Sequence, residues 1–140
     1  MTTTAARSPR LGHASPLTEM PMSDPSYAND AVVRLVEIPA GGAYQDSHFP
    51  EHPIFPGVFL AELCCRLALD LVDHAPAVWA VTQIRALRLV APVHPGETLE
   101  VRTVRDAQAG PARNSVDVWS TFSRDGTVVG TAYVTLEPQP

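Results

Sequence analysis

The stretch that contributes most to a fold assignment is His48-Phe-Pro-Glu-His-Pro-Ile-Phe-Pro-Gly-Val-Phe-Leu-Ala-Glu62. Three prolines between residues 48 and 57 each fix φ and remove a backbone donor, so this part is predicted to be a stiff loop. Apolar residues then fill almost every position from 57 to 73, and Pro76 follows, which predicts a helix over 57–73. A helix that is apolar on nearly all sides must be enclosed by the rest of its domain.

The chain on either side of this stretch predicts strands. Residues 31–38 are rich in β-branched side chains and precede Pro39, which indicates a strand and its turn. Beyond the helix, turn signals at Pro95-Gly96, Gly110-Pro111 and Asp125-Gly126 separate further candidates. These predicted strands are 77–84, 87–93, 98–105, 115–124 and 127–136. One buried helix followed by antiparallel strands predicts an α+β architecture in which a curled sheet wraps a central helix.

The length and composition predict one packed domain behind a tail. The chain has 140 residues, of which 45% are hydrophobic and 18% are charged, as in ordinary globular proteins. Residues 1–29 contain scattered Thr, Ser, Pro and Met with no apolar periodicity, so we expect a flexible N-terminal tail there. Residues 30–140 are then the single domain.

Several classes of function are disfavoured. The formal charge of -5 and the lack of a basic run argue against a nucleic-acid partner. No uncharged apolar stretch is long enough to span a membrane, and no secretory signal opens the chain, so we expect a cytoplasmic protein. The adjacent Cys64 and Cys65 cannot form an ordinary disulfide with each other, and inert thiols in a reducing compartment are expected. His48, His52 and His94 do not make a convincing metal site, and neither a metal nor another cofactor is expected.

The motif holds groups that suit the elimination of water beside a thioester carbonyl. That reaction needs a base, an acid and a donor to the oxygen on which negative charge develops. Histidine changes its charge near neutral pH, so His48 suits the base. A glutamate in an apolar pocket resists ionisation because desolvation penalises its charge, so Glu62 suits the acid. Backbone N–H groups at a helix start lack partners, and Gly57 lets an oxygen approach them closely.

Plainer interpretations exist for each residue alone. His48 could be a turn residue satisfied by local hydrogen bonds. Glu62 could pair with Arg66, and Arg66 with Asp70, in a ladder of charges spaced four residues apart. The conjunction with the Pro56-Gly57 step favours the catalytic interpretation, because a buried helix has no packing reason to carry a carboxylate in its second turn.

The motif resembles the signature of the 3-hydroxyacyl-acyl carrier protein dehydratases of the FabZ and FabA type, including the 14-residue spacing from His48 to Glu62. Ala91-Pro-Val-His-Pro-Gly-Glu97 resembles a turn of that family, and Arg124-Asp-Gly-Thr-Val-Val-Gly-Thr-Ala132 resembles its closing hairpin. The likeness covers most of residues 31–136 and implies the hot-dog fold, a long central helix wrapped by a curled antiparallel sheet.

The resemblance implies roles for the motif. His48 is the base, Glu62 is the acid, and the Gly57 amide donates to the thioester carbonyl. Residues beside them are assigned to substrate binding, namely Phe49, Pro56 and Val58. The implied substrate is a 3-hydroxyacyl chain on an acyl carrier protein, and the implied product is a trans-2-enoyl thioester. The resemblance also implies a dimer, either a homodimer or a heterodimer with another hot-dog subunit, in which the histidine of one chain faces the carboxylate of the other.

Two departures from the family pattern favour a specialised member. Arg66 stands where the family usually has glutamine, and Val90-Ala91 stand in place of a basic pair. They favour polyketide or polyene assembly over standard fatty-acid synthesis. They also leave open a non-catalytic or half-catalytic subunit of a heterodimeric dehydratase. An acyl thioesterase is a weaker alternative, because a paired acid and base suit elimination.

Overall fold

The computed structural model describes residues 20–28, 31–39, 54–55, 57–72, 77–106 and 114–140. These residues form one helix and six strands. In chain order the elements are β1 (Ser26–Ala28), β2 (Ala31–Glu37), α2 (Gly57–Asp70), β3 (Trp79–Leu89), β4 (Thr98–Arg105), β5 (Val116–Arg124) and β6 (Thr127–Pro138).

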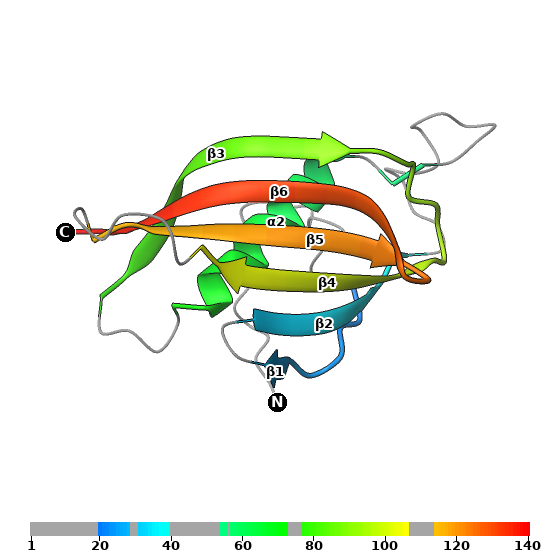
Figure 1. Cartoon of the computed structure of the whole chain (residues 1–140), viewed down its shortest axis with the longest axis horizontal. Helices are drawn as coiled ribbons and strands as arrows, with labels where there is room; N and C mark the ends of the chain where they lie inside the picture. The colour runs from blue at the N-terminus through cyan, green and yellow to red at the C-terminus, as the bar shows by residue number, and fades with distance from the viewer. Residues whose placement is uncertain (1–19, 29–30, 40–53, 56, 73–76, 107–113) are drawn as a thin grey trace, which may run out of the picture.

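The six strands make a single antiparallel sheet in the order β1-β2-β4-β5-β6-β3. Figure 1 shows the curved sheet with α2 running behind its central strands. The predicted hairpin at Asp125-Gly126 joins β5 to β6, and both turn residues have positive φ values, 51° and 82°. The α+β prediction, with a central helix wrapped by an antiparallel sheet, is confirmed.

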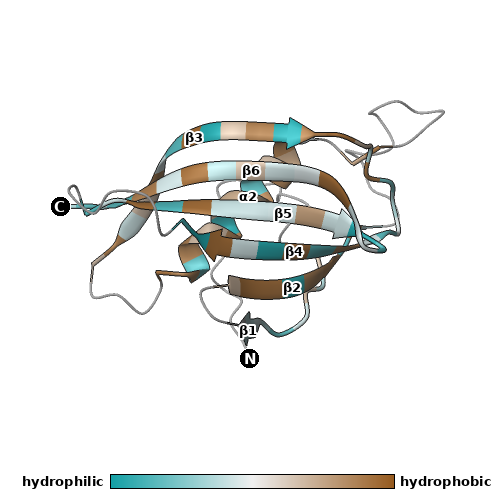
Figure 2. Ribbon diagram, viewed as in Figure 1, coloured by the Kyte–Doolittle hydropathy of each residue, from teal (hydrophilic) through white to brown (hydrophobic). Residues whose placement is uncertain are grey.

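The hydrophobic core lies between α2 and the concave face of the sheet. Side chains alternate between the two faces of a strand, so every second residue of β4 reaches this core. The helix contributes Leu60, Leu63, Cys64, Leu67 and Ala68. In Figure 2, both hydrophilic and hydrophobic residues occur along the strands, as expected for a sheet with one face in the core. Helix α2 ends at Asp70, three residues before the predicted end, and a turn follows in which the Leu71 N–H bonds to the Ala68 carbonyl.

Strand β3 differs from the prediction of two separate strands over 77–84 and 87–93. It is one strand whose pairing with β6 shifts register between Val81 and Gln83 and again between Ile84 and Ala86. A register shift of this kind adds a residue to one strand and so changes the face to which the following side chains point. The side chains then no longer alternate regularly between the two faces of the sheet. In the sequence, this break in the alternation looks like the end of one strand and the start of another.

The prediction of a loosely packed tail over 1–29 is wrong for residues 20–28. Met20 is only 7% exposed and belongs to the core, and Met22 forms an isolated bridge with Val36. β1 then pairs with β2. Residues 1–19 lie outside the described part of the chain, and so do residues 29–30.

Strand β3 lies at one edge of the described sheet and pairs there with β6. Large apolar side chains of β3 and the residue after it are exposed, namely Ile84, Leu87, Leu89 and Val90. An edge strand offers unpaired backbone groups to another chain, and exposed apolar side chains favour such contact. In the described residues, no helix has the length and apolar character needed to cross a membrane.

Candidate functional site

The site is built around the start of α2, which is Gly57. The first N–H groups of a helix have no partner within the helix, and the helix dipole favours negative charge beside them. The first turn of α2 contains no acidic residue whose side chain could accept hydrogen bonds from these N–H groups. The chain enters the helix from Phe55, whose N–H donates to the Val93 carbonyl at 2.7 Å. This bond holds the helix start against the segment that follows β3.

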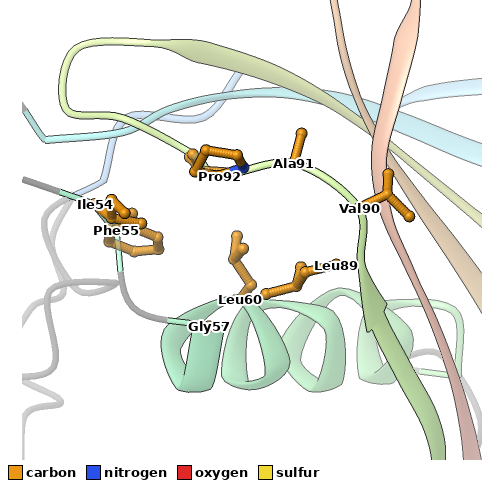
Figure 3. Close-up of a pocket in the computed structure, with 9 residues that line it drawn as sticks. Ile54, Phe55, Gly57, Leu60, Leu89, Val90, Ala91 and Pro92 are labelled. Carbon is orange, nitrogen blue, oxygen red and sulfur yellow. The ribbon is translucent and has the colours of Figure 1, made fainter.

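An apolar cavity of about 330 Å³ opens at the helix start. One wall consists of Ile54, Phe55, Gly57 and Leu60, and the other is the continuous segment from residue 89 to residue 93. Figure 3 shows Phe55, Leu60 and Pro92 around the open space, with Gly57 at its lower rim. All of these residues are apolar, so the cavity suits a hydrocarbon chain, while the helix start offers N–H groups to an oxygen.

The far wall of the cavity is fixed by an ion pair. An Arg124 Nη1 group donates to the Pro92 carbonyl at 3.0 Å and to Glu97 Oε1 at 2.8 Å. The same Glu97 oxygen accepts from the His94 N–H at 2.8 Å. Desolvation alone would raise the pKa of Glu97, but the hydrogen bonds from His94 and Arg124, together with their charge, lower it below its ordinary value.

Glu62 lies on α2 but does not line this cavity. Its Oε2 atom is 3.2 Å from Nη2 of Arg66, and its side chain is 38% exposed. Within one chain Glu62 is therefore at a charged surface and not in the apolar surroundings that the sequence led us to expect. The ladder does not continue to Asp70, which pairs with Arg34 on β2 at 3.3 Å.

The remaining predicted residues are distributed as follows. Val58 is 68% exposed on the helix surface and does not line the cavity. Three residues of the motif, His48, Phe49 and Pro56, lie outside the described residues, as does His52. The structure thus brings Gly57 to an apolar cavity, and the placement of the histidine relative to Glu62 stays a prediction.

The two cysteines do not belong to the cavity. Cys64 is buried and lies 3.5 Å from the Ser120 hydroxyl, and burial raises the pKa of its thiol to about 11. Burial also raises the pKa of Cys65. Both thiols therefore stay protonated near neutral pH and are poor nucleophiles. Among the residues that the structure describes, no group of three or more His, Cys, Asp or Glu side chains could hold a metal ion.

Comparison with known proteins identifies the family. The family model described as ApeI dehydratase, of the ApeI-like group, matches residues 25–125. The chain belongs to the ApeI-like dehydratase family. Its α+β architecture is the hot-dog fold.

Two curated relatives of this ApeI-like chain are named 3-hydroxyacyl-[acyl-carrier-protein] dehydratase FabZ. The protein from Acidiphilium cryptum (strain JF-5) is 26% identical over 110 residues, which are 74% of this chain and 62% of the relative. The protein from Roseiflexus castenholzii (strain DSM 13941 / HLO8) is 36% identical over 58 residues, 39% of this chain and 41% of the relative. The chain thus spans less than two thirds of the length of the curated relatives that it matches.

Solved structures share the fold of the ApeI-like chain at low identity. The dehydratase heterocomplex ApeI:P from Xenorhabdus doucetiae superposes with a TM-score of 0.67 at 16% identity, over 84% of this chain and 97% of that one. A hypothetical thioesterase from Streptococcus pneumoniae TIGR4 with coenzyme A has a TM-score of 0.63 at 12% identity, over 83% and 87% of the two chains.

Sequence reasoning missed the far wall of the cavity in this ApeI-like chain. The motif at 48–62 indicated Gly57, but no sequence pattern indicated that residues 89–93 would face it. The Pro95-Gly96 turn is bonded just beyond the end of β2 through the Gly96 N–H and the Ile38 carbonyl, and so it does not indicate the cavity. The contact depends on register and on the Phe55 to Val93 hydrogen bond, neither of which a local pattern reveals.

Proposed function

We propose that the chain is a dehydratase that removes water from a 3-hydroxyacyl thioester on an acyl carrier protein and releases a trans-2-enoyl thioester. The observation that carries the proposal is the apolar cavity at Gly57, at the start of the same helix that bears Glu62 in its second turn. Membership of a dehydratase family and the FabZ names of the curated relatives support the same reaction.

The proposed reaction assigns each group one step. His48 takes a proton from the carbon beside the carbonyl, and the electrons of that C–H bond form the new double bond. The C–O bond at the third carbon breaks, and Glu62 protonates the departing hydroxyl to give water. The Gly57 N–H donates to the thioester oxygen while it carries negative charge. Phe49 and Pro56 contact the substrate beside these groups, whereas Val58, which lies on the exposed helix surface outside the cavity, contacts it only where a partner chain extends the site over that surface.

We propose a dimer as the active assembly. Strand β3 is an edge strand of the sheet that the described residues form, and its exposed apolar side chains provide a surface for a second hot-dog chain. In such a dimer His48 of one chain faces Glu62 of the other, and the partner covers a carboxylate that is accessible in the single chain. The similar ApeI:P protein forms a dehydratase heterocomplex, which supports a heterodimer as an alternative to a homodimer.

The pathway is proposed from the departures in the motif. Arg66 in place of the usual glutamine and Val90-Ala91 in place of a basic pair favour polyketide or polyene assembly over ordinary fatty-acid synthesis. We place the reaction in the cytoplasm.

The proposal is tested by incubating the purified chain with a 3-hydroxyacyl carrier protein and following the intact carrier by mass spectrometry. The wild type is expected to produce a loss of one water. His48→Ala and Glu62→Gln are each expected to reduce the rate by at least about 100-fold, the usual contribution of general acid–base catalysis. Glu100→Gln, at an exposed position of β4, is the matched control and should leave the rate unchanged.

Each alternative has its own outcome. Free carboxylic acid as the main product would indicate a thioesterase, a reaction favoured by the structural likeness to the streptococcal protein. Dehydration only after addition of a second hot-dog chain would indicate a half-catalytic subunit. If the carrier-bound substrate keeps its mass under all of these conditions, the proposed function is wrong.

A further inference from the structure

Arg124 connects the β5–β6 hairpin to the wall of the cavity. It is the last residue of β5, and its Nη1 group donates to the Pro92 carbonyl at 3.0 Å and to Glu97 Oε1 at 2.8 Å. Pro92 lines the cavity, whereas Arg124 and Glu97 do not. Arg124 therefore acts on a ligand in the cavity through the segment that it holds and not by direct contact.

The wall segment 89–93 is bonded to the rest of the fold on both sides of Pro92. Before it, the Val90 N–H donates to a carbonyl of β6 at 2.9 Å. After it, the Val93 carbonyl accepts an N–H from the chain that enters α2, at 2.7 Å. Pro92 itself has no backbone N–H, so its carbonyl is the backbone group through which it can be held. That carbonyl accepts the hydrogen bond from Arg124.

The guanidinium of Arg124 is itself fixed from two sides. Its backbone lies directly before the Asp125-Gly126 turn, whose positive φ values define the hairpin. On the other side Glu97 accepts its hydrogen bond with an oxygen that also accepts the His94 N–H. Hydrogen bonds between charged groups are stronger than neutral ones, so this pair keeps the guanidinium beside Pro92.

We propose that Arg124 is a positioning residue for acyl binding, because it holds Pro92 at the separation from the helix start that suits an acyl chain. This inference rests on the proposed function, since the ligand is taken to be an acyl thioester with its oxygen at Gly57. Figure 3 shows Pro92 and Gly57 on opposite sides of the open space. Without the bond to Arg124, the wall can move relative to the helix start, and its contact with the acyl chain decreases.

A positioning role has a kinetic signature of its own. The wall contacts the acyl chain before and during the reaction, so its position affects the binding of substrate and transition state alike. The loss of such uniform binding raises KM and leaves kcat unchanged. Loss of the proposed acid Glu62 should lower kcat instead. The two parameters therefore separate the role of Arg124 from a catalytic one.

The test compares Arg124→Met with Arg34→Met, which is a closely matched control. Methionine keeps an unbranched apolar side chain and removes the guanidinium. Arg34 also joins a backbone carbonyl to a carboxylate, through bonds to Ser23 at 3.1 Å and to Asp70 at 3.3 Å. This second junction lies at the last residue of α2, at the opposite end of the helix from the cavity. Urea unfolding of both variants measures how much stability each substitution removes.

The probe is the amide analogue of hexanoyl pantetheine, in which N–H replaces the thioester sulfur, so that it is neither dehydrated nor hydrolysed as a thioester. Arg124→Met is expected to weaken its binding about tenfold, the effect of losing a hydrogen bond to a charged group. The KM for 3-hydroxyhexanoyl carrier protein should rise by a similar factor with kcat unchanged. Glu97→Gln, which keeps Arg124 and weakens its anchor, should cause a smaller loss. Arg34→Met should bind the probe as the wild type does.

Unchanged probe binding in Arg124→Met would overturn the inference, and so would an equal loss in Arg34→Met or a wild type that does not bind the probe. If Arg124→Met does not fold, Glu97→Gln decides, and unchanged binding there would overturn the inference. Weaker binding in Arg124→Met, together with a wild type that never dehydrates its substrate, would keep the role of Arg124 and refute the proposed reaction. Dehydration by a wild type whose Arg124→Met variant keeps its KM and probe affinity would do the reverse.

Discussion

At the scale of single residues, the surroundings of Glu62 matter because it is the proposed acid of the reaction. In one chain it pairs with Arg66 at 3.2 Å, and both side chains are more than one third exposed. An exposed pair of this kind contributes little to stability, about 0.2 to 1 kcal/mol. The pair with Arg66 therefore contributes little by itself to the stability of the fold.

Glu97 permits a prediction about pH. Its pKa is lowered in the folded chain, so its contribution to stability is present above the ordinary value of 4.5 and is lost as the pH falls through the lower, folded value. Glu97→Gln is expected to cost about 1 kcal/mol at neutral pH, since it weakens the bonds to Arg124 and to the His94 N–H. Urea unfolding measured over a series of pH values checks this.

The difference between Glu97→Gln and the wild type should shrink in acid, because the wild-type carboxyl group is then neutral as well. The same change at the exposed Glu100 serves as the control. If Glu97→Gln lowers the free energy of unfolding equally at every pH, or not at all at neutral pH, the ion pair between Glu97 and Arg124 does not support the wall of the cavity.

Residue patterns predicted part of the site. The Pro56-Gly57 step is a local signal, and it pointed to Gly57, which lines the cavity. The carboxylate in an apolar helix pointed to Glu62, which lies outside the cavity of one chain, and its catalytic role stays a prediction. Leu89, which also lines the cavity, gave no signal, because it meets Gly57 and Gly130 only in the folded chain. The sequence also gave no indication of the ion pair between Glu97 and Arg124, because the two residues meet only after the sheet has formed.

At the scale of elements, local periodicity predicted α2 and most strands. It failed at β3, where two register shifts interrupt the alternation of side chains. It also failed for residues 20–28, because Met20 and Met22 are single apolar contacts that form no period of their own. Both errors have one physical cause, namely that the neighbouring strand and not the local sequence fixes the position of these segments.

The edge of β3 supports a prediction about association. Leu87 is exposed in the single chain and is expected to be buried against a second chain, so Leu87→Asp should reduce dimer formation by placing a charge in an apolar interface. Light scattering after gel filtration measures the mass in solution. The control is Leu35→Asp on β2, at the other side of the sheet. A Leu87→Asp protein that stays as dimeric as the wild type would exclude this edge as the interface.

At the scale of the whole molecule, one chain supplies only part of the proposed site. The helix start and the apolar cavity are assembled within it, whereas Glu62 lies on the helix surface outside the cavity. A second chain across β3 would add a wall and exclude water from this surface. The sequence implied such an assembly only through its resemblance to a family, because spacing within one chain carries no information about symmetry.

The most direct test of the central claim is a mixing experiment with two inactive variants. His48→Ala and Glu62→Gln chains are co-expressed, and dehydration of a 3-hydroxyacyl carrier protein is measured for the mixture and for each variant alone. If each site takes His48 from one chain and Glu62 from the other, mixed dimers contain one intact site, and about a quarter of wild-type activity should return. A mixture that contains mixed dimers and yet stays as inactive as its components would contradict the account.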